Sequence, residues 1–171
     1  MDKELIKGLI AEYQQFVKSV SFVKRAVTLS DNFNYVFVGL RRVGKSYLMY
    51  QQIHHLIETG ISPEEILFFN FEDERIAGMD TEHLDMIKRC YEEMYSHRPI
   101  FFLDEIQIVP HWEQFVRRLA DQKYRVYVTG SNAKMLSKDI ATTLGGRFMI
   151  QYVYPFSFRE YLSSNGVQLD K

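Results

Sequence analysis

The sequence predicts an α/β domain in which helices cover both faces of a parallel β-sheet. The chain has 171 residues, of which 46% are apolar and 25% charged, enough for the packed core of one domain of ordinary size. Five apolar runs have the length of buried strands, and helical patterns separate most of them. Strands that alternate with helices typically form a parallel sheet that is covered on both faces. We therefore expect one domain over residues 1–162 and a polar tail over residues 163–171.

The first expected element is an amphipathic helix over residues 4–20. Apolar residues recur there at helical spacing, from Leu5 and Ile6 to Val17 and Val20, and charged or polar residues take the other face. The strand-like runs then follow at residues 35–38, 66–71, 100–103, 125–128 and 148–154. Helical patterns occupy residues 47–57, 84–95 and 112–120, and a capping sequence at residues 157–160 predicts a C-terminal helix.

Composition limits the possible classes of function. The 21 positive and 22 negative charges nearly cancel, so charge gives no support to a DNA partner, and a DNA or protein partner is left open only as a possibility. The single cysteine, Cys90, excludes an internal disulfide framework and a zinc cluster built on cysteines. No apolar stretch approaches the roughly 18 residues of a membrane span. We expect a soluble cytoplasmic protein without a membrane partner.

The first strand leads into a phosphate-binding pattern. Residues 39–46 (GLRRVGKS) fit G-x-x-x-x-G-K-[ST], and an amphipathic helix follows them. The glycines let successive N–H groups face an anion, Lys45 can reach the β- and γ-phosphates, and the Ser46 hydroxyl can ligate Mg²⁺. Arg41 and Arg42 either contact a phosphate or a neighbouring subunit or are solvated loop charges. The expected nucleotide-binding residues are Gly39, Leu40, Arg41, Arg42, Val43, Gly44, Lys45, Ser46 and Tyr47.

Two carboxylates end the third strand-like run. Because the carboxyl ends of parallel strands line one edge of a sheet, Asp104 is expected near the phosphate loop, where it would hold Mg²⁺ through water. Glu105 is then placed to orient and deprotonate an attacking water. A metabolite kinase has no need of such a glutamate, so Glu105 favours hydrolysis. The sequence contains no guanine-reading [NT]-K-x-D pattern, which leaves ATP as the expected nucleotide. The adenine pocket is poorly specified, with residues 22–29 as its only candidate segment.

Two further residues are weaker catalytic candidates. Asn132, or its neighbour Ser131, follows the fourth strand and could sense the γ-phosphate or the water, although either could instead cap a helix. Arg147 follows two glycines, and its guanidinium could stabilise transition-state charge as an arginine finger. The alternative for Arg147 is an ordinary surface arginine.

Taken together, the motifs resemble an AAA-type ATPase family of archaea and bacteria, close to the signal-transduction and origin-recognition branches of the phosphate-loop NTPases. The matching stretches are residues 39–46 (GLRRVGKS), 102–107 (FLDEIQ) followed by Trp112, 129–134 (TGSNAK), 145–147 (GGR) and 154–162 (YPFSFREYL). The resemblance implies a three-layer P-loop fold with a five-stranded sheet in the order 5-1-4-3-2. It also implies ATP and Mg²⁺ at the C-terminal edge of that sheet, with Arg147 acting in trans in a homo-oligomer.

The resemblance also implies a region that this sequence does not contain. Family members normally continue into a helical lid and a further C-terminal domain, so we expect residues 163–171 to begin such a region. The leading hypothesis is a Mg²⁺-dependent ATPase domain, an AAA-type hydrolase that couples nucleotide state to conformational change. The alternative is a nucleotide-gated DNA- or protein-binding switch with little intrinsic hydrolysis. A small-molecule kinase is a third reading, without an identifiable acceptor pocket.

Overall fold

Five parallel strands form one sheet in the order β2-β3-β4-β1-β5, which is the predicted order read from the opposite edge. The structure is a computed structural model that describes residues 2–131, 135 and 139–166. The strands are β1 (Asn34–Val38), β2 (Ile66–Asn70), β3 (Ile100–Asp104), β4 (Val126–Gly130) and β5 (Phe148–Tyr152). Each lies within about two residues of a predicted run, so the predicted α/β fold and strand order are confirmed.

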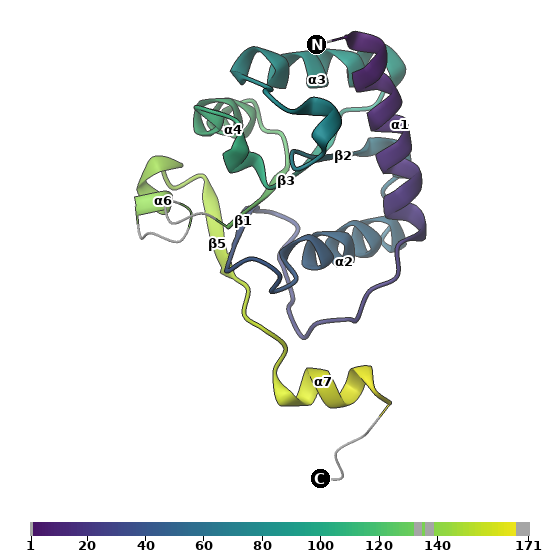
Figure 1. Cartoon of the computed structure of the whole chain (residues 1–171), viewed down its shortest axis with the longest axis vertical. Helices are drawn as coiled ribbons and strands as arrows, with labels where there is room; N and C mark the ends of the chain where they lie inside the picture. The colour runs from purple at the N-terminus through teal and green to yellow at the C-terminus, as the bar shows by residue number, and fades with distance from the viewer. Residues whose placement is uncertain (1, 132–134, 136–138, 167–171) are drawn as a thin grey trace.

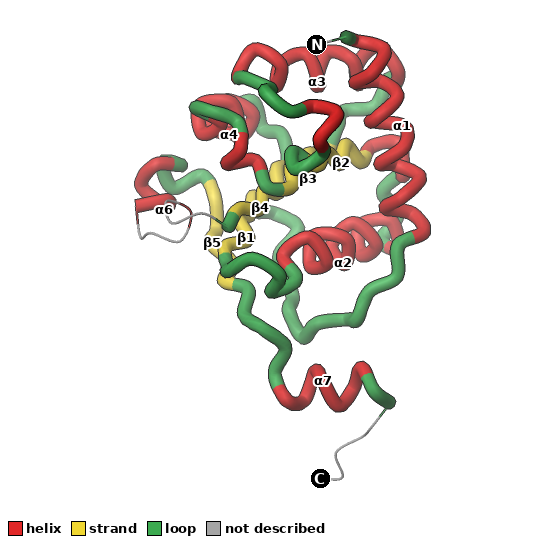
Figure 2. The backbone as a smooth tube through the Cα atoms, in the orientation of Figure 1, coloured by secondary structure: helices red, strands yellow, loops and turns green. Residues whose placement is uncertain are grey.

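Helices cover the two faces of the sheet. The helices are α1 (Lys3–Ser19), α2 (Lys45–Glu58), α3 (Thr81–Met94), α4 (Trp112–Asp121), α6 (Asp139–Thr143) and α7 (Phe158–Ser164). Figures 1 and 2 show the sheet nearly edge-on, with α2 on one side and α4 and α6 on the other, and α1 packs against β2. In both views α7 hangs away from the sheet at the end of an extended segment. In the part of the chain that the structure describes, no helix is long and apolar enough to span a membrane.

The central strands are buried on both faces, which explains why they read as continuous apolar runs rather than as alternating patterns. The ring of Tyr127 in β4 stacks on Phe102 of β3 at 4.5 Å between centroids and on Tyr35 of β1 at 6.0 Å. Offset aromatic contacts of this kind add to the free energy gained from burial. This packing fixes β3, β4 and β1 side by side.

Helix ends follow from local sequence. Asp2 caps α1 by accepting from the Glu4 N–H, so the helix begins one residue before the predicted position and ends at Ser19. Ser157 and Glu160 form the predicted capping box of α7, which continues to Ser164, past the expected domain end at residue 162.

The same sheet edge carries the ends of β1, β4 and β3, in that spatial order. β1 runs into the phosphate-binding loop and α2, β3 ends at Asp104, and β4 ends at Gly130. A short 3₁₀ helix, η3 (Ile106–Ile108), follows β3. Lys45, Asp104 and Glu105, three of the residues predicted to act on a nucleotide, therefore meet at one edge, as expected for an open parallel sheet.

Candidate functional site

The phosphate-binding loop is shaped by its two glycines. A Cβ on Gly39 would lie 2.4 Å from the carbonyl oxygen of Val153, so no other residue fits there without a shift of the backbone. Gly44 has φ 95° and forms the N-cap of α2. Because glycine has no side chain to cap the helix, the first N–H groups of α2 are left to an external acceptor. This geometry suits an anion.

Lys45 is the first residue of α2, and its side chain is buried in the loop. The ammonium donates to the Leu40 carbonyl oxygen at 3.0 Å and lies 3.4 Å from Glu105 Oε1. Only 4% of the residue is exposed. A buried ammonium with one carboxylate and one carbonyl partner is poised to exchange them for phosphate oxygens.

Asp104 lies at the end of β3 with 4% of its surface exposed. Its Oδ1 accepts from Ser46 Oγ at 3.1 Å and from Thr129 Oγ1 at 2.5 Å. Burial raises the pKa of the Asp104 carboxyl to about 6, although these two hydrogen bonds act in the opposite direction. The ionised form thus lacks enough positive partners, a deficit that a bound cation would relieve.

Ser46 and Asp104 fit Mg²⁺, which prefers hard oxygen ligands and is usually held by one or two protein groups together with substrate phosphates. Among residues 2–131, 135 and 139–166, no three His, Cys, Asp or Glu side chains gather into a self-sufficient metal site. Phosphate oxygens would therefore have to complete the coordination.

Glu105 adopts a left-handed backbone conformation with φ 53°, which is rare for a residue with a side chain. Its N–H donates to Thr129 Oγ1 at 2.8 Å. Its Oε1 faces Lys45, and its Oε2 accepts from Ser131 Oγ at 2.8 Å and from Gln107 Nε2 at 2.6 Å. Both carboxylate oxygens are therefore held, in a residue that is 7% exposed.

Thr129 is a site residue that the sequence analysis missed. It is fully buried in β4, between the other two strands, and one hydroxyl accepts from the Glu105 N–H while it donates to Asp104. A polar residue near the end of an otherwise apolar strand was the available signal. The predicted candidates, Ser131 and Asn132, instead follow the strand.

The weaker candidates have separate outcomes. Ser131 contacts Glu105, whereas Asn132 lies outside the described residues. Arg147 stands just before β5, where the parallel strands begin, whereas the phosphate-binding loop lies where they end. The Arg147 Nε donates to Asp121 at 2.6 Å. Its distant location means that it does not reach the site of its own chain. Arg41 pairs with Glu72, while 75% of its side chain remains exposed to solvent.

Two adjoining cavities flank the loop, and they share Arg42, Gly44 and Tyr47. The polar cavity, so named for the charged side chains in its wall, measures about 650 Å³, and Arg41, Lys45, Glu72 and Glu105 are among the residues that line it. The second cavity measures about 720 Å³ and is mainly apolar, with Phe22, Val23 and Phe156 in its wall. A polar compartment next to an apolar one suits a ligand with a charged end and a flat apolar end.

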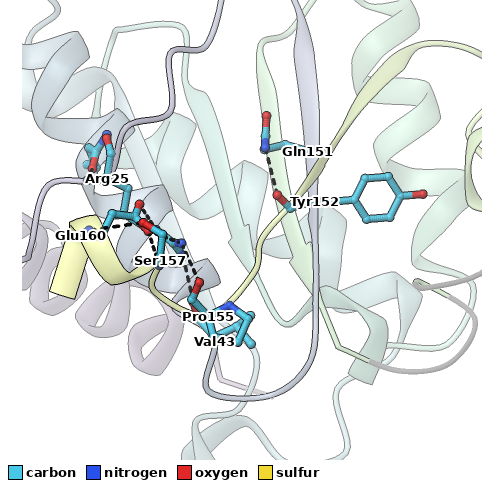
Figure 3. A network of polar contacts seen from close by, with 8 residues as sticks. Arg25, Val43, Gln151, Tyr152, Pro155, Ser157 and Glu160 are labelled. Carbon is cyan, nitrogen blue, oxygen red and sulfur yellow. Dashed lines mark hydrogen bonds and ion pairs between the residues drawn. The ribbon is translucent and has the colours of Figure 1, made fainter.

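Arg25 joins three segments beside the apolar cavity (Figure 3). Its guanidinium donates to both Glu160 carboxylate oxygens at 3.1 and 3.2 Å, to the Val43 carbonyl at 3.1 Å and to the Pro155 carbonyl at 3.4 Å. It also lies 5.1 Å from the centroid of the Phe156 ring. The segment before β1, the phosphate-binding loop and α7 thus meet at one 8%-exposed side chain.

Replacing Arg25 with methionine is expected to release α7 while the sheet stays folded. None of residues 158–164 is buried, so the helix depends on Arg25 rather than on apolar packing. We expect the rate of amide exchange in residues 158–164 to rise at least tenfold. A factor of this size corresponds to the free energy of about one lost charge-assisted hydrogen bond. Hydrogen–deuterium exchange measures this, with Arg159→Met on the exposed face of α7 as the matched control.

The same contact has a defined pH window. Arg25 holds the pKa of Glu160 at about 2, below its ordinary value of 4.5, so the pair stabilises the folded form above pH 4.5 and is lost as the pH falls toward 2. Wild-type protection of α7 should therefore persist from pH 7 to pH 5. Equal exchange in the wild type and in Arg25→Met at pH 7 would contradict the role of Arg25.

Comparisons with known proteins agree with this geometry. A sequence model of the AAA domain family matches residues 31–162. The chain is 32% identical to an uncharacterized protein of Methanocaldococcus jannaschii over 171 residues, covering 99% of this chain and 37% of that protein. It is 36% identical to an uncharacterized protein of Haemophilus influenzae over 151 residues, covering 86% of this chain and 38% of that protein. The chain thus spans little more than a third of the length of these curated relatives.

Proposed function

The chain belongs to the AAA domain family, and from this premise we propose that it is a Mg²⁺-dependent ATPase domain that couples its nucleotide state to conformational change. The observation that carries the proposal is the convergence of Lys45, Ser46, Asp104 and Glu105 within one hydrogen-bonded cluster. Each contact joins a different pair of elements at the edge where a nucleotide would bind.

The proposed binding mode uses both cavities. The triphosphate would occupy the polar cavity against the first N–H groups of α2, and Lys45 would leave Leu40 and Glu105 for the phosphates. Adenine would enter the apolar cavity beside Phe22 and Val23, within the segment that the sequence suggested. Mg²⁺, when held by Ser46 and Asp104, would neutralise phosphate charge.

Hydrolysis would follow from the release of Glu105. Once Lys45 has moved, Glu105 Oε1 has lost its cationic partner, and it can accept a proton from the attacking water. The oxygen of that water forms a bond to the γ-phosphorus, and the bond from phosphorus to the β,γ-bridging oxygen breaks. The products are ADP and phosphate, and the proton resides on Glu105 until solvent removes it.

Coupling would pass through the phosphate-binding loop. Val43 accepts from Arg25, and Arg25 also holds Glu160 in α7. A shift of the loop on nucleotide binding would reach α7 through Arg25. We propose that this contact transmits the nucleotide state to the C-terminal part of the chain.

One observation favours the alternative of a nucleotide-gated protein- or DNA-binding switch with little hydrolysis of its own. Arg147 is paired with Asp121 at the far edge of the sheet, so a finger would have to come from a neighbouring copy of the chain. Without such an assembly, no Arg147 guanidinium would stabilise the negative charge of the transition state, and ATP would be bound but hydrolysed slowly.

Phosphate release measured against protein concentration tests both proposals. We expect the rate per chain to rise steeply with concentration, and Arg147→Ala to lower the rate at high concentration by about 100-fold or more, as for other arginine fingers. Asp121→Asn, which frees Arg147 from its ion pair, is the matched control and should retain the concentration dependence. Flat rates near zero, with MgATP bound, would favour the switch. A normal rate in Arg147→Ala would exclude the finger.

A further inference from the structure

Gln107 contacts the proposed general base from a neighbouring turn. It lies in η3, two residues after Glu105, and its Nε2 donates to Glu105 Oε2 at 2.6 Å. Ser131 donates to the same oxygen from the end of β4. One oxygen of the carboxylate is therefore held by two donors of the chain, while the other, Oε1, faces Lys45.

The orientation of the Gln107 amide is set by chemistry. An ionised carboxylate only accepts hydrogen bonds, so the amide must present its NH₂ group to Glu105 and turn its carbonyl oxygen away. That oxygen is buried and has no hydrogen-bond partner among the residues the structure describes. It points toward the end of β4, where a Cβ on Gly130 would lie 2.7 Å from it.

The carbonyl end of Gln107 opposes stability, although its NH₂ group stabilises the Glu105 carboxylate. A buried carbonyl oxygen without a partner lowers the free energy of unfolding, and an apolar side chain of similar length would avoid that loss. Gly130 leaves the space that Gln107 Oε1 occupies. A polar side chain that is unfavourable for folding, yet held against a candidate catalytic group, points to a role in the reaction.

We propose that Gln107 is a positioning residue that fixes Glu105 Oε2, so that Oε1 is the oxygen presented to the attacking water. This inference rests on the proposed hydrolysis. When Lys45 moves to the phosphates, the Gln107 and Ser131 contacts remain and prevent the carboxylate from following the ammonium. Without them, Glu105 rotates away from the water, and the barrier to proton transfer rises.

The variant Gln107→Met separates positioning from folding. Methionine has nearly the length of glutamine but neither donates to Glu105 nor carries an unpaired oxygen. We expect kcat to fall at least tenfold and KM for MgATP to stay within twofold, while the melting temperature changes little because the lost donor and the removed unpaired oxygen have opposite effects. Gln114→Met, at an exposed position of α4, is the matched control and should keep the wild-type kcat.

A kcat for Gln107→Met within twofold of the wild type would overturn the proposal, as would a fall in kcat that a lowered melting temperature accounts for. Absence of phosphate release from the wild type in single-turnover assays would instead count against the proposed function. A crystal structure of the wild type with a non-hydrolysable ATP analogue and Mg²⁺ is a separate test. Gln107 Nε2 should remain within hydrogen-bond distance of Glu105 Oε2 there, and a broken contact would overturn the positioning role.

Discussion

Replacing Lys45 with methionine is expected to weaken MgATP binding by at least about 100-fold, the loss expected for charge-assisted hydrogen bonds to phosphate. The nucleotide-free protein should also be less stable, because the variant leaves the buried Glu105 carboxylate without its cation. Breaking a buried ion pair costs about 3 kcal/mol, which for a domain of this size lowers the melting temperature by roughly 8 °C. Calorimetric titration and thermal unfolding measure the two effects.

A double variant separates the two roles of Lys45. Adding Glu105→Gln to Lys45→Met removes the uncompensated charge, so most of the lost stability should return while nucleotide binding stays weak. Unchanged binding in Lys45→Met would refute the proposed nucleotide site. Unchanged stability would show that the Lys45–Glu105 contact contributes little to the nucleotide-free fold.

The variant Glu105→Gln should bind MgATP and hydrolyse it about 10²–10⁴-fold more slowly, the range expected for loss of a general base. Binding should be tighter than in the wild type, because Lys45 no longer leaves a carboxylate when it moves to the phosphates. A fluorescent ATP analogue measures affinity, and a phosphate-release assay measures turnover.

Glu74→Gln is the matched control, since it removes one negative charge from an exposed position in the 3₁₀ helix η2 (Glu74–Ile76). It should leave both affinity and turnover close to wild type. If Glu105→Gln retains full turnover, Glu105 is not the base, and the inference about Gln107 fails with it.

The sequence predicted most of the fold because the central strands are buried on both faces. Strand segments such as residues 100–103 are then continuously apolar, which distinguishes them from the helical segments, where apolar and polar residues recur with the helical period. The main site was also predictable, since the phosphate-loop pattern and the Asp104–Glu105 pair each follow a strand, and parallel strands bring their ends to one edge.

The supporting residues were not predictable in the same way. Thr129 and Arg25 act through contacts with residues 18 or more positions away in the chain, and no local spacing marks them. Gln107 is close to Glu105 in sequence, but their contact depends on the left-handed conformation of Glu105, which the residue type disfavours. Tertiary packing, rather than local propensity, determines these three contacts.

The attachment of α7 to the rest of the domain through the Arg25 guanidinium has a mechanical consequence. Because the helix buries none of its residues 158–164, a pull applied to it is borne by Arg25 and the adjoining backbone rather than spread over a packed interface. Arg25 is in turn anchored on the Val43 carbonyl, one residue before the glycine that caps α2. Tension on α7 would therefore strain the loop proposed to bind the phosphates, and a movement of that loop would in turn pull on α7.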